Sequence, residues 1–82
     1  MSDTIETITG VLSGLLGKYA KPGSTIKAST NLVADLGLES VSILEFVVDV
    51  EDHYDLNIDI ESLSDVHTVL DMAQVVARLQ NR

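Results

Sequence analysis

The absence of cysteine from a chain of only 82 residues is the feature that most restricts its fold. A chain of this length forms one small domain, and without disulfides or thiolate-bound metal its stability depends on a single packed core. Hydrophobic residues make up 45% of the chain and aromatic residues only 4%, so Leu, Ile and Val have to build most of that core. We therefore expect one domain over residues 1–82, with neither a disulfide nor a cysteine nucleophile.

The net charge excludes several classes of partner. Thirteen acidic residues against five lysines and arginines give a formal net charge of -8 at pH 7, which is the wrong sign for binding nucleic acids or anionic membranes. No apolar run exceeds three residues, so no segment is expected to insert into a membrane, and the N-terminal residues lack the basic start of a secretory signal. The sequence predicts a cytoplasmic protein.

The negative charge is concentrated in one part of the chain. Residues 35–71, here called the acidic stretch, hold eleven acidic residues and no Lys or Arg. Such a stretch is typical either of a solvated face or of a surface that meets basic partners.

Apolar residues at helical spacing predict a first helix over residues 4–19, with Ser2 or Asp3 as its cap. Turn-forming residues over 20–39 then predict a long loop. We expect three of its side chains to anchor this loop to the core: Leu32, Leu36 and Leu38.

A second helix is predicted over residues 40–54, with Ser40 as its N-cap. One apolar stripe of this helix is expected to face the core: Ile43, Phe46, Val47, Val50 and Tyr54. A second set, interleaved with acidic residues, is either a contact surface or an extension of the core: Val41, Leu44 and Val48.

The last third of the chain predicts a connector over 55–66 with one helical turn at 60–63, and then a final helix. Thr68 and Asp71 have the spacing of a capping box at the start of this helix. The predicted fold class is all-α, a small bundle of three main helices plus one short helix with a long first loop.

The sequence contains no arrangement expected of a catalytic or metal site. His53 and His67 lack the spacing of zinc ligands. A calcium loop starting at Asp55 fails, because the required Gly and Glu positions hold Ile60 and Val66. We therefore expect that the protein is not an enzyme and binds no metal.

The segment Asp35-Leu36-Gly37-Leu38-Glu39-Ser40 resembles the acyl carrier protein family, in which Asp-Leu-Gly-x-Asp-Ser-Leu carries a serine esterified by 4′-phosphopantetheine. The resemblance extends over nearly the whole chain and implies an acyl-carrier-protein-like fold. It also implies that Ser40 is the attachment site, at a helix N-terminus whose dipole stabilises the phosphodiester. Ser42 is the nearby alternative, but it lies two residues inside the helix.

The resemblance implies a phosphopantetheine-modified carrier that holds acyl groups as thioesters for fatty-acid, lipid or polyketide-type biosynthesis. It implies two kinds of partner: a carrier protein synthase (phosphopantetheinyl transferase) and biosynthetic enzymes with basic patches. The protein is expected to be a monomer. The expected recognition residues are Glu39, Val41, Leu44, Glu45, Val48, Asp49, Glu51 and Asp52. Departures at Glu39, Val41 and Ser42 suggest a specialised carrier. Alternatives are an aminoacyl or peptidyl carrier and an unmodified acidic interaction module.

Overall fold

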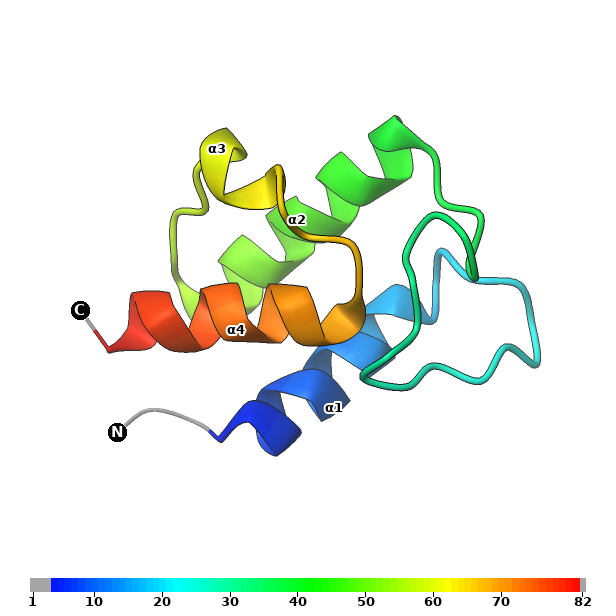
Figure 1. The fold of residues 1–82 in the computed structure, drawn as a ribbon, viewed down its shortest axis with the longest axis horizontal. Coiled ribbons are helices and arrows are strands. Elements are labelled where there is room, and N and C mark those ends of the chain that lie inside the picture. Colours follow the sequence, from blue (N-terminus) through cyan, green and yellow to red (C-terminus); the bar gives the residue numbers. More distant parts are fainter. Residues whose placement is uncertain (1–3, 82) are drawn as a thin grey trace.

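The computed structural model describes residues 4–81, and these form four helices. The order along the chain is α1 (Ile5–Leu16), α2 (Ser40–Tyr54), α3 (Ile60–Leu63) and α4 (Val69–Gln80). Figure 1 shows the three longer helices packed together, with α3 beside α2 and α4. The predicted all-α bundle of three main helices and one short helix is confirmed. None of the described helices has the length and apolar character needed to cross a membrane.

Helix α1 is shorter than predicted and has a different cap. Thr4 is the N-cap, and its hydroxyl accepts a hydrogen bond from the backbone N–H of Thr7 at 3.1 Å. The proposed caps Ser2 and Asp3 lie outside the described residues. The helix ends at Leu16, and the residues after it form turns rather than the predicted continuation to residue 19. Three side chains of α1 are completely buried: Ile8, Leu12 and Leu16.

Helix α2 packs its predicted apolar stripe against the core, and α4 supplies five further buried residues. In α2 the buried side chains are Phe46, Val47 and Val50, while Ile43 and Tyr54 are partly buried against the same core. Helix α4 begins with the predicted capping box, in which Thr68 Oγ1 accepts from the Asp71 N–H and Asp71 Oδ2 accepts from the Thr68 N–H. The buried residues of α4 are Val69, Met72, Ala73, Val75 and Val76.

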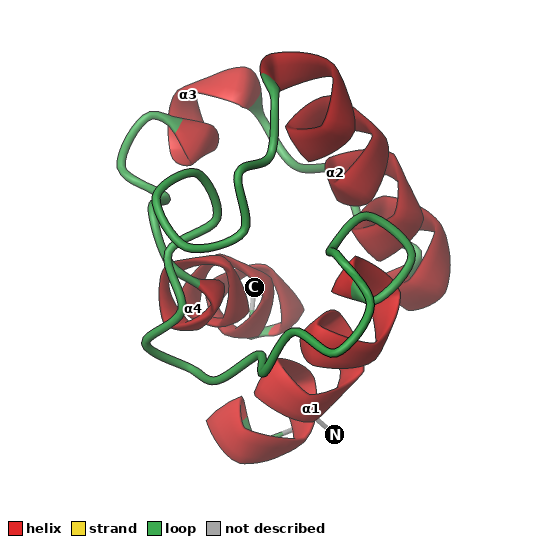
Figure 2. Cartoon of the chain, turned by 90° about the vertical axis from the view of Figure 1, so that its right-hand side faces the viewer, coloured by secondary structure: helices red, strands yellow, loops and turns green. Residues whose placement is uncertain are grey.

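The long loop between α1 and α2 is fastened to the start of α4. The Leu32 N–H donates to the His67 carbonyl at 2.9 Å, and the Val69 N–H donates to the Thr30 carbonyl at 3.1 Å. Leu32 and Leu38 are buried, which confirms them as anchors, and Leu36 is partly buried. Figure 2 looks onto this loop, which crosses one end of the bundle. These bonds and anchors fix the segment that leads into α2.

Candidate functional site

The segment before α2 is a compact turn organised by Asn31. Its Oδ1 accepts from the backbone N–H groups of Val33 at 3.0 Å and Ala34 at 2.8 Å, and its own N–H donates to Asp35 Oδ2 at 2.7 Å. The turn closes at Gly37, whose N–H donates to the Val33 carbonyl and whose φ is +67°. Glycine adopts this left-handed conformation without the steric cost that a side chain brings.

Ser40 is the first residue of α2, and its side chain is exposed. The prediction that Ser40 is the N-cap is wrong by one position, because Glu39 has the extended backbone of a cap, with φ -87° and ψ 165°. The first turn closes when the Ile43 N–H donates to the Glu39 carbonyl at 2.9 Å. The serine hydroxyl therefore stands at the very start of the helix, at the end of the long loop.

The N-terminus of α2 carries no side-chain cap, whereas those of α1 and α4 are capped by threonine hydroxyls. The first turn of α2 also contains no acidic residue. The free N–H groups and the positive end of the helix dipole are therefore available to an anion bound there. A phosphodiester on the exposed Ser40 hydroxyl fits this environment in both charge and access.

The second apolar set of α2 is solvent-exposed. The exposed fractions are 63% for Val41, 52% for Leu44 and 51% for Val48. The alternative that these residues extend the core is therefore wrong. Glu45 and Asp52 are exposed as well, and the helical spacing of 41, 45, 48 and 52 puts them on the same side of the helix. This exposed face of α2, defined by these five residues, combines apolar and acidic groups and begins one residue after Ser40.

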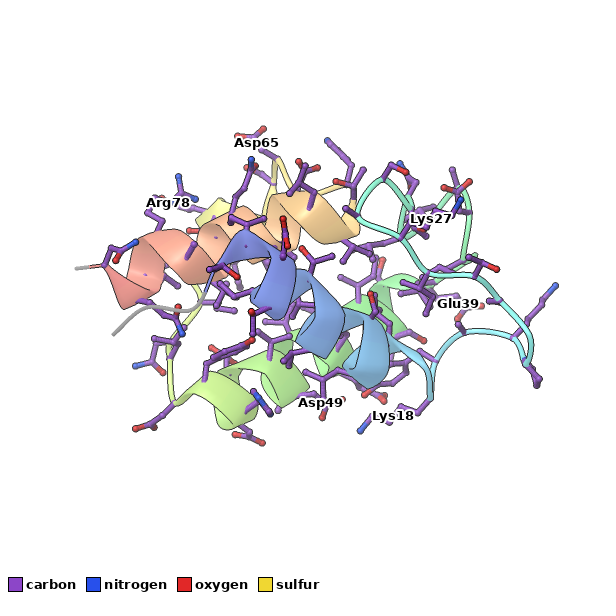
Figure 3. The ribbon with its side chains drawn as sticks, turned by 90° about the horizontal axis from the view of Figure 1, so that it is seen from below. Lys18, Lys27, Glu39, Asp49, Asp65 and Arg78 are labelled. Carbon is purple, nitrogen blue, oxygen red and sulfur yellow. The ribbon has the colours of Figure 1, made fainter. Side chains whose placement is uncertain are left out.

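The other expected recognition residues differ in their surroundings. Glu39 is exposed beside Ser40 at the end of the loop. Asp49 Oδ2 accepts a hydrogen bond from Tyr19 Oη at 2.6 Å and lies 2.9 Å from Lys18 Nζ (Figure 3). The Tyr19 hydroxyl and then the Lys18 ammonium lower the pKa of Asp49. Glu51 Oε2 accepts from the Ile58 N–H at 2.8 Å and so holds the connector to α3.

The sequence reasoning missed three groups around this site. The first is Asn31, whose side-chain oxygen shapes the turn as a hydrogen-bond acceptor. Asn followed by Asp four residues later is compatible with such a turn. Val33 on the same turn is 58% exposed, and its exposure was not predicted. Lys18 and Tyr19 reach Asp49 across 30 residues of sequence or more, and no local pattern could have identified that contact.

Metal and histidine chemistry find no support in residues 4–81. No group of three or more His, Cys, Asp or Glu side chains is arranged there to hold a metal ion. His53 and His67 are exposed and lie in different elements, since His53 is in α2 and His67 precedes α4.

Comparisons with known proteins identify the family of this chain. The family described as "Phosphopantetheine attachment site" matches residues 6–76. The chain is 31% identical over 78 residues to an acyl carrier protein of Phaeodactylum tricornutum, with 95% of this chain and 99% of that protein covered. It is 30% identical over 71 residues to an acyl carrier protein of Exiguobacterium sp., with 87% and 90% covered.

A solved structure of a mitochondrial acyl carrier protein specific to toxoplasma has the same fold. It superposes with a TM-score of 0.83 at 23% sequence identity, and the match covers 95% of this chain and 92% of the other. The family match over most of the chain and the sequence relatives together establish the family. The chain belongs to the acyl carrier protein family, whose members carry a covalent 4′-phosphopantetheine and are carriers rather than enzymes.

Proposed function

We propose that Ser40 is the residue to which 4′-phosphopantetheine is attached, within a single carrier domain formed by residues 1–82. The observation that carries this proposal is the exposed Ser40 hydroxyl at the only one of the three main helix starts in residues 4–81 that lacks a side-chain cap. Ser42, the nearby alternative, is partly buried and lies in the second position after Ser40.

The residues of the chain have three roles in this function. The Ser40 oxygen forms the ester bond to the phosphate, and the open N-terminus of α2 stabilises the negative charge of the phosphodiester. The Asn31 turn and the buried Leu38 hold that start of α2 in place. The arm, when attached, supplies the terminal thiol that binds the acyl group as a thioester.

We further propose that partner enzymes dock on the exposed face of α2, which we call the docking face from here on. Its carboxylates suit basic patches on a partner, because attraction of opposite charges raises the rate of encounter. Its three exposed apolar side chains provide a small contact area that excludes water without making the complex permanent. The first partner is the carrier synthase that attaches the arm, and Glu39 is the acidic group next to the serine that this enzyme meets.

For the cargo, we propose acyl intermediates of fatty-acid, lipid or polyketide-type biosynthesis, because the sequence relatives are acyl carrier proteins. Glu39 stands where the family motif has Asp, which supports a specialised pathway over central fatty-acid synthesis. The proposal also includes a monomer in the cytoplasm. Size-exclusion chromatography with light scattering checks the first part, and cell fractionation checks the second.

The attachment site is tested by intact-protein mass spectrometry after incubation with coenzyme A, magnesium and a broad-specificity carrier synthase. The wild-type chain should gain one phosphopantetheine group. Ser40→Ala should gain none, while the matched control Ser42→Ala should be modified like the wild type. Modification of Ser40→Ala would disprove the assignment, and an unmodified wild-type chain would favour an acidic interaction module.

The docking face is tested by charge reversal. Glu45→Lys and Asp52→Lys should each lower kcat/KM for arm attachment and weaken its dependence on salt, because they reduce the attraction between carrier and enzyme. Lys substitution at Glu61 in α3, an exposed residue outside the docking face, is the control with the same change of charge. Equal effects at Glu45 and Glu61 would mean that only net charge matters.

A further inference from the structure

We propose that Lys18 neutralises the charge of Asp49, which the Tyr19 hydroxyl holds in place, so that Lys18 sets how strongly α2 attracts a basic partner. The proposal rests on the proposed carrier function and concerns the electrostatic attraction between the docking face and a basic partner. It makes Lys18 a residue that tunes recognition, although it lies on the turn after α1 and outside the docking face itself.

The geometry concentrates two donors on one carboxylate oxygen. Tyr19 Oη donates to Asp49 Oδ2 at 2.6 Å, and Lys18 Nζ lies 2.9 Å from the same oxygen. Lys18 Nζ also lies 5.4 Å from the centre of the Tyr19 ring, within the range of a cation–π contact. The Asp49 side chain is only 22% exposed and that of Lys18 is 60% exposed, so the ammonium is the more accessible partner.

The other acidic side chains of α2 do not share this neutralisation. Within the described part of the chain, Glu45, Glu51 and Asp52 form no ion pair with Lys, Arg or His. Glu51 accepts a hydrogen bond from the neutral backbone N–H of Ile58, and this contact leaves its charge uncompensated. Asp49 is therefore the one carboxylate of α2 in residues 40–54 whose charge is cancelled by a neighbouring cation.

The electrostatic consequence follows from the sum of the charges. A carboxylate and an ammonium in contact act on a distant partner as a dipole, whose field decays faster than that of a single charge. Removing only the ammonium would expose the carboxylate charge at the border of the docking face. Removing both groups would leave the long-range field nearly unchanged.

The test compares charge variants in arm attachment by a basic carrier synthase, measured as kcat/KM at low ionic strength. Lys18→Met keeps much of the side-chain length and should raise kcat/KM about twofold, the effect of one unit charge ~10 Å away in water. Lys18→Met/Asp49→Asn should restore the wild-type value. Lys21→Met makes the same change of net charge on the loop, where it forms no ion pair with the described residues, and should have a clearly smaller effect.

The outcomes separate neutralisation from its alternatives. The gain from Lys18→Met should vanish at 1 M salt, where the Debye length is about 3 Å. If kcat/KM of Lys18→Met/Asp49→Asn is as low as that of Glu45→Gln, Asp49 contacts the partner directly. That result would overturn the proposal. Equal gains from Lys18→Met and Lys21→Met would also overturn it, because net charge alone would then explain the rate.

A second readout does not need the synthase. The carboxyl carbon of Asp49, followed by NMR, should titrate below the usual aspartate pKa in the wild type and closer to it in Lys18→Met. An Asp49 titration unaffected by Lys18→Met would overturn the pairing. If the titration moves as expected while the wild-type chain takes up no arm, the ion pair stands and the carrier function of Ser40 fails instead.

Discussion

Two glycines on the outer side of α1 lower the stability of the domain, and replacing them with alanine should raise it. Gly10 and Gly14 are exposed within α1, on the side opposite the buried Ile8 and Leu12. A Cβ atom built at either glycine meets no other group within 4 Å. Alanine therefore adds no clash, while it removes the conformational freedom that glycine gives the unfolded chain.

The expected gain is about 0.5 to 1 kcal/mol for each substitution, which is the cost of glycine relative to alanine inside a helix. In a domain of this size 1 kcal/mol shifts the melting temperature by about 4 to 8 °C. Each single variant should thus melt roughly 2 to 8 °C higher, and Gly10→Ala/Gly14→Ala about twice as far above the wild type. Gly17→Ala should gain less, because its Cβ would lie 3.2 Å from the Gly14 carbonyl oxygen.

Thermal melts followed by circular dichroism, with urea titrations for the free energy, measure these changes. Gly23→Ala and Gly37→Ala are matched controls, since their φ angles of +85° and +67° should make the same chemical change destabilising by about 1 to 2 kcal/mol. Arm attachment by the synthase should be unchanged in Gly10→Ala and Gly14→Ala. Melting of these two variants at or below the wild-type temperature would show that Gly10 and Gly14 do not destabilise α1.

Four further predictions concern the cap of α4, the connector before α3 and the repulsion within the acidic stretch. Thr68→Ala should lower the free energy of unfolding in urea by about 1 kcal/mol, because it removes the α4 cap. The backbone N–H groups of His67 and Thr68 lower the pKa of Asp71. The charged Asp71 side chain therefore stabilises the folded state above about pH 4, and this stabilisation is lost as the pH falls further. Asp71→Asn should make the melting temperature less sensitive to acid. Glu51→Ala should cost about 1 kcal/mol by leaving the Ile58 N–H without its acceptor, and Glu51→Gln less. Melting temperatures should rise with salt, because salt screens the repulsion within the acidic stretch. The rise should be larger with magnesium than with sodium chloride at equal ionic strength, because the divalent cation binds weakly to clustered carboxylates.

The sequence predicted the bounds of α2 and α3 and the start of α4 more accurately than the bounds of α1. Helix α2 covers the predicted residues 40–54, α3 the predicted residues 60–63, and α4 begins directly after the predicted capping threonine. Each of these boundaries depends on residues within one or two helical turns. Local patterns therefore contained enough information to place them.

The end of α1 and the environment of the acidic residues depended on partners distant in sequence. Tyr19 continues the helical spacing of α1, but it lies beyond the end of the helix at Leu16 and donates its hydroxyl to Asp49. In the same way, the spacing of the acids in α2 could not distinguish Asp49, which has a lysine beside it, from Asp52, which is exposed. The position of the candidate site was predictable, whereas its effective charge required the packing of α1 against α2.

The start of α2 is positioned from inside the molecule rather than by a polar cap on its surface. A Ser, Thr, Asp or Asn cap stabilises a helix by about 1 kcal/mol, and α2 begins without one. Instead, Leu38 is buried two residues before Ser40, and the loop that leads to it is bonded to the start of α4. Apolar anchoring fixes the helix terminus while its outward N–H groups and the serine hydroxyl stay accessible. A carrier needs both properties at one residue, because the arm has to be held at a defined point and that point has to be reached by enzymes.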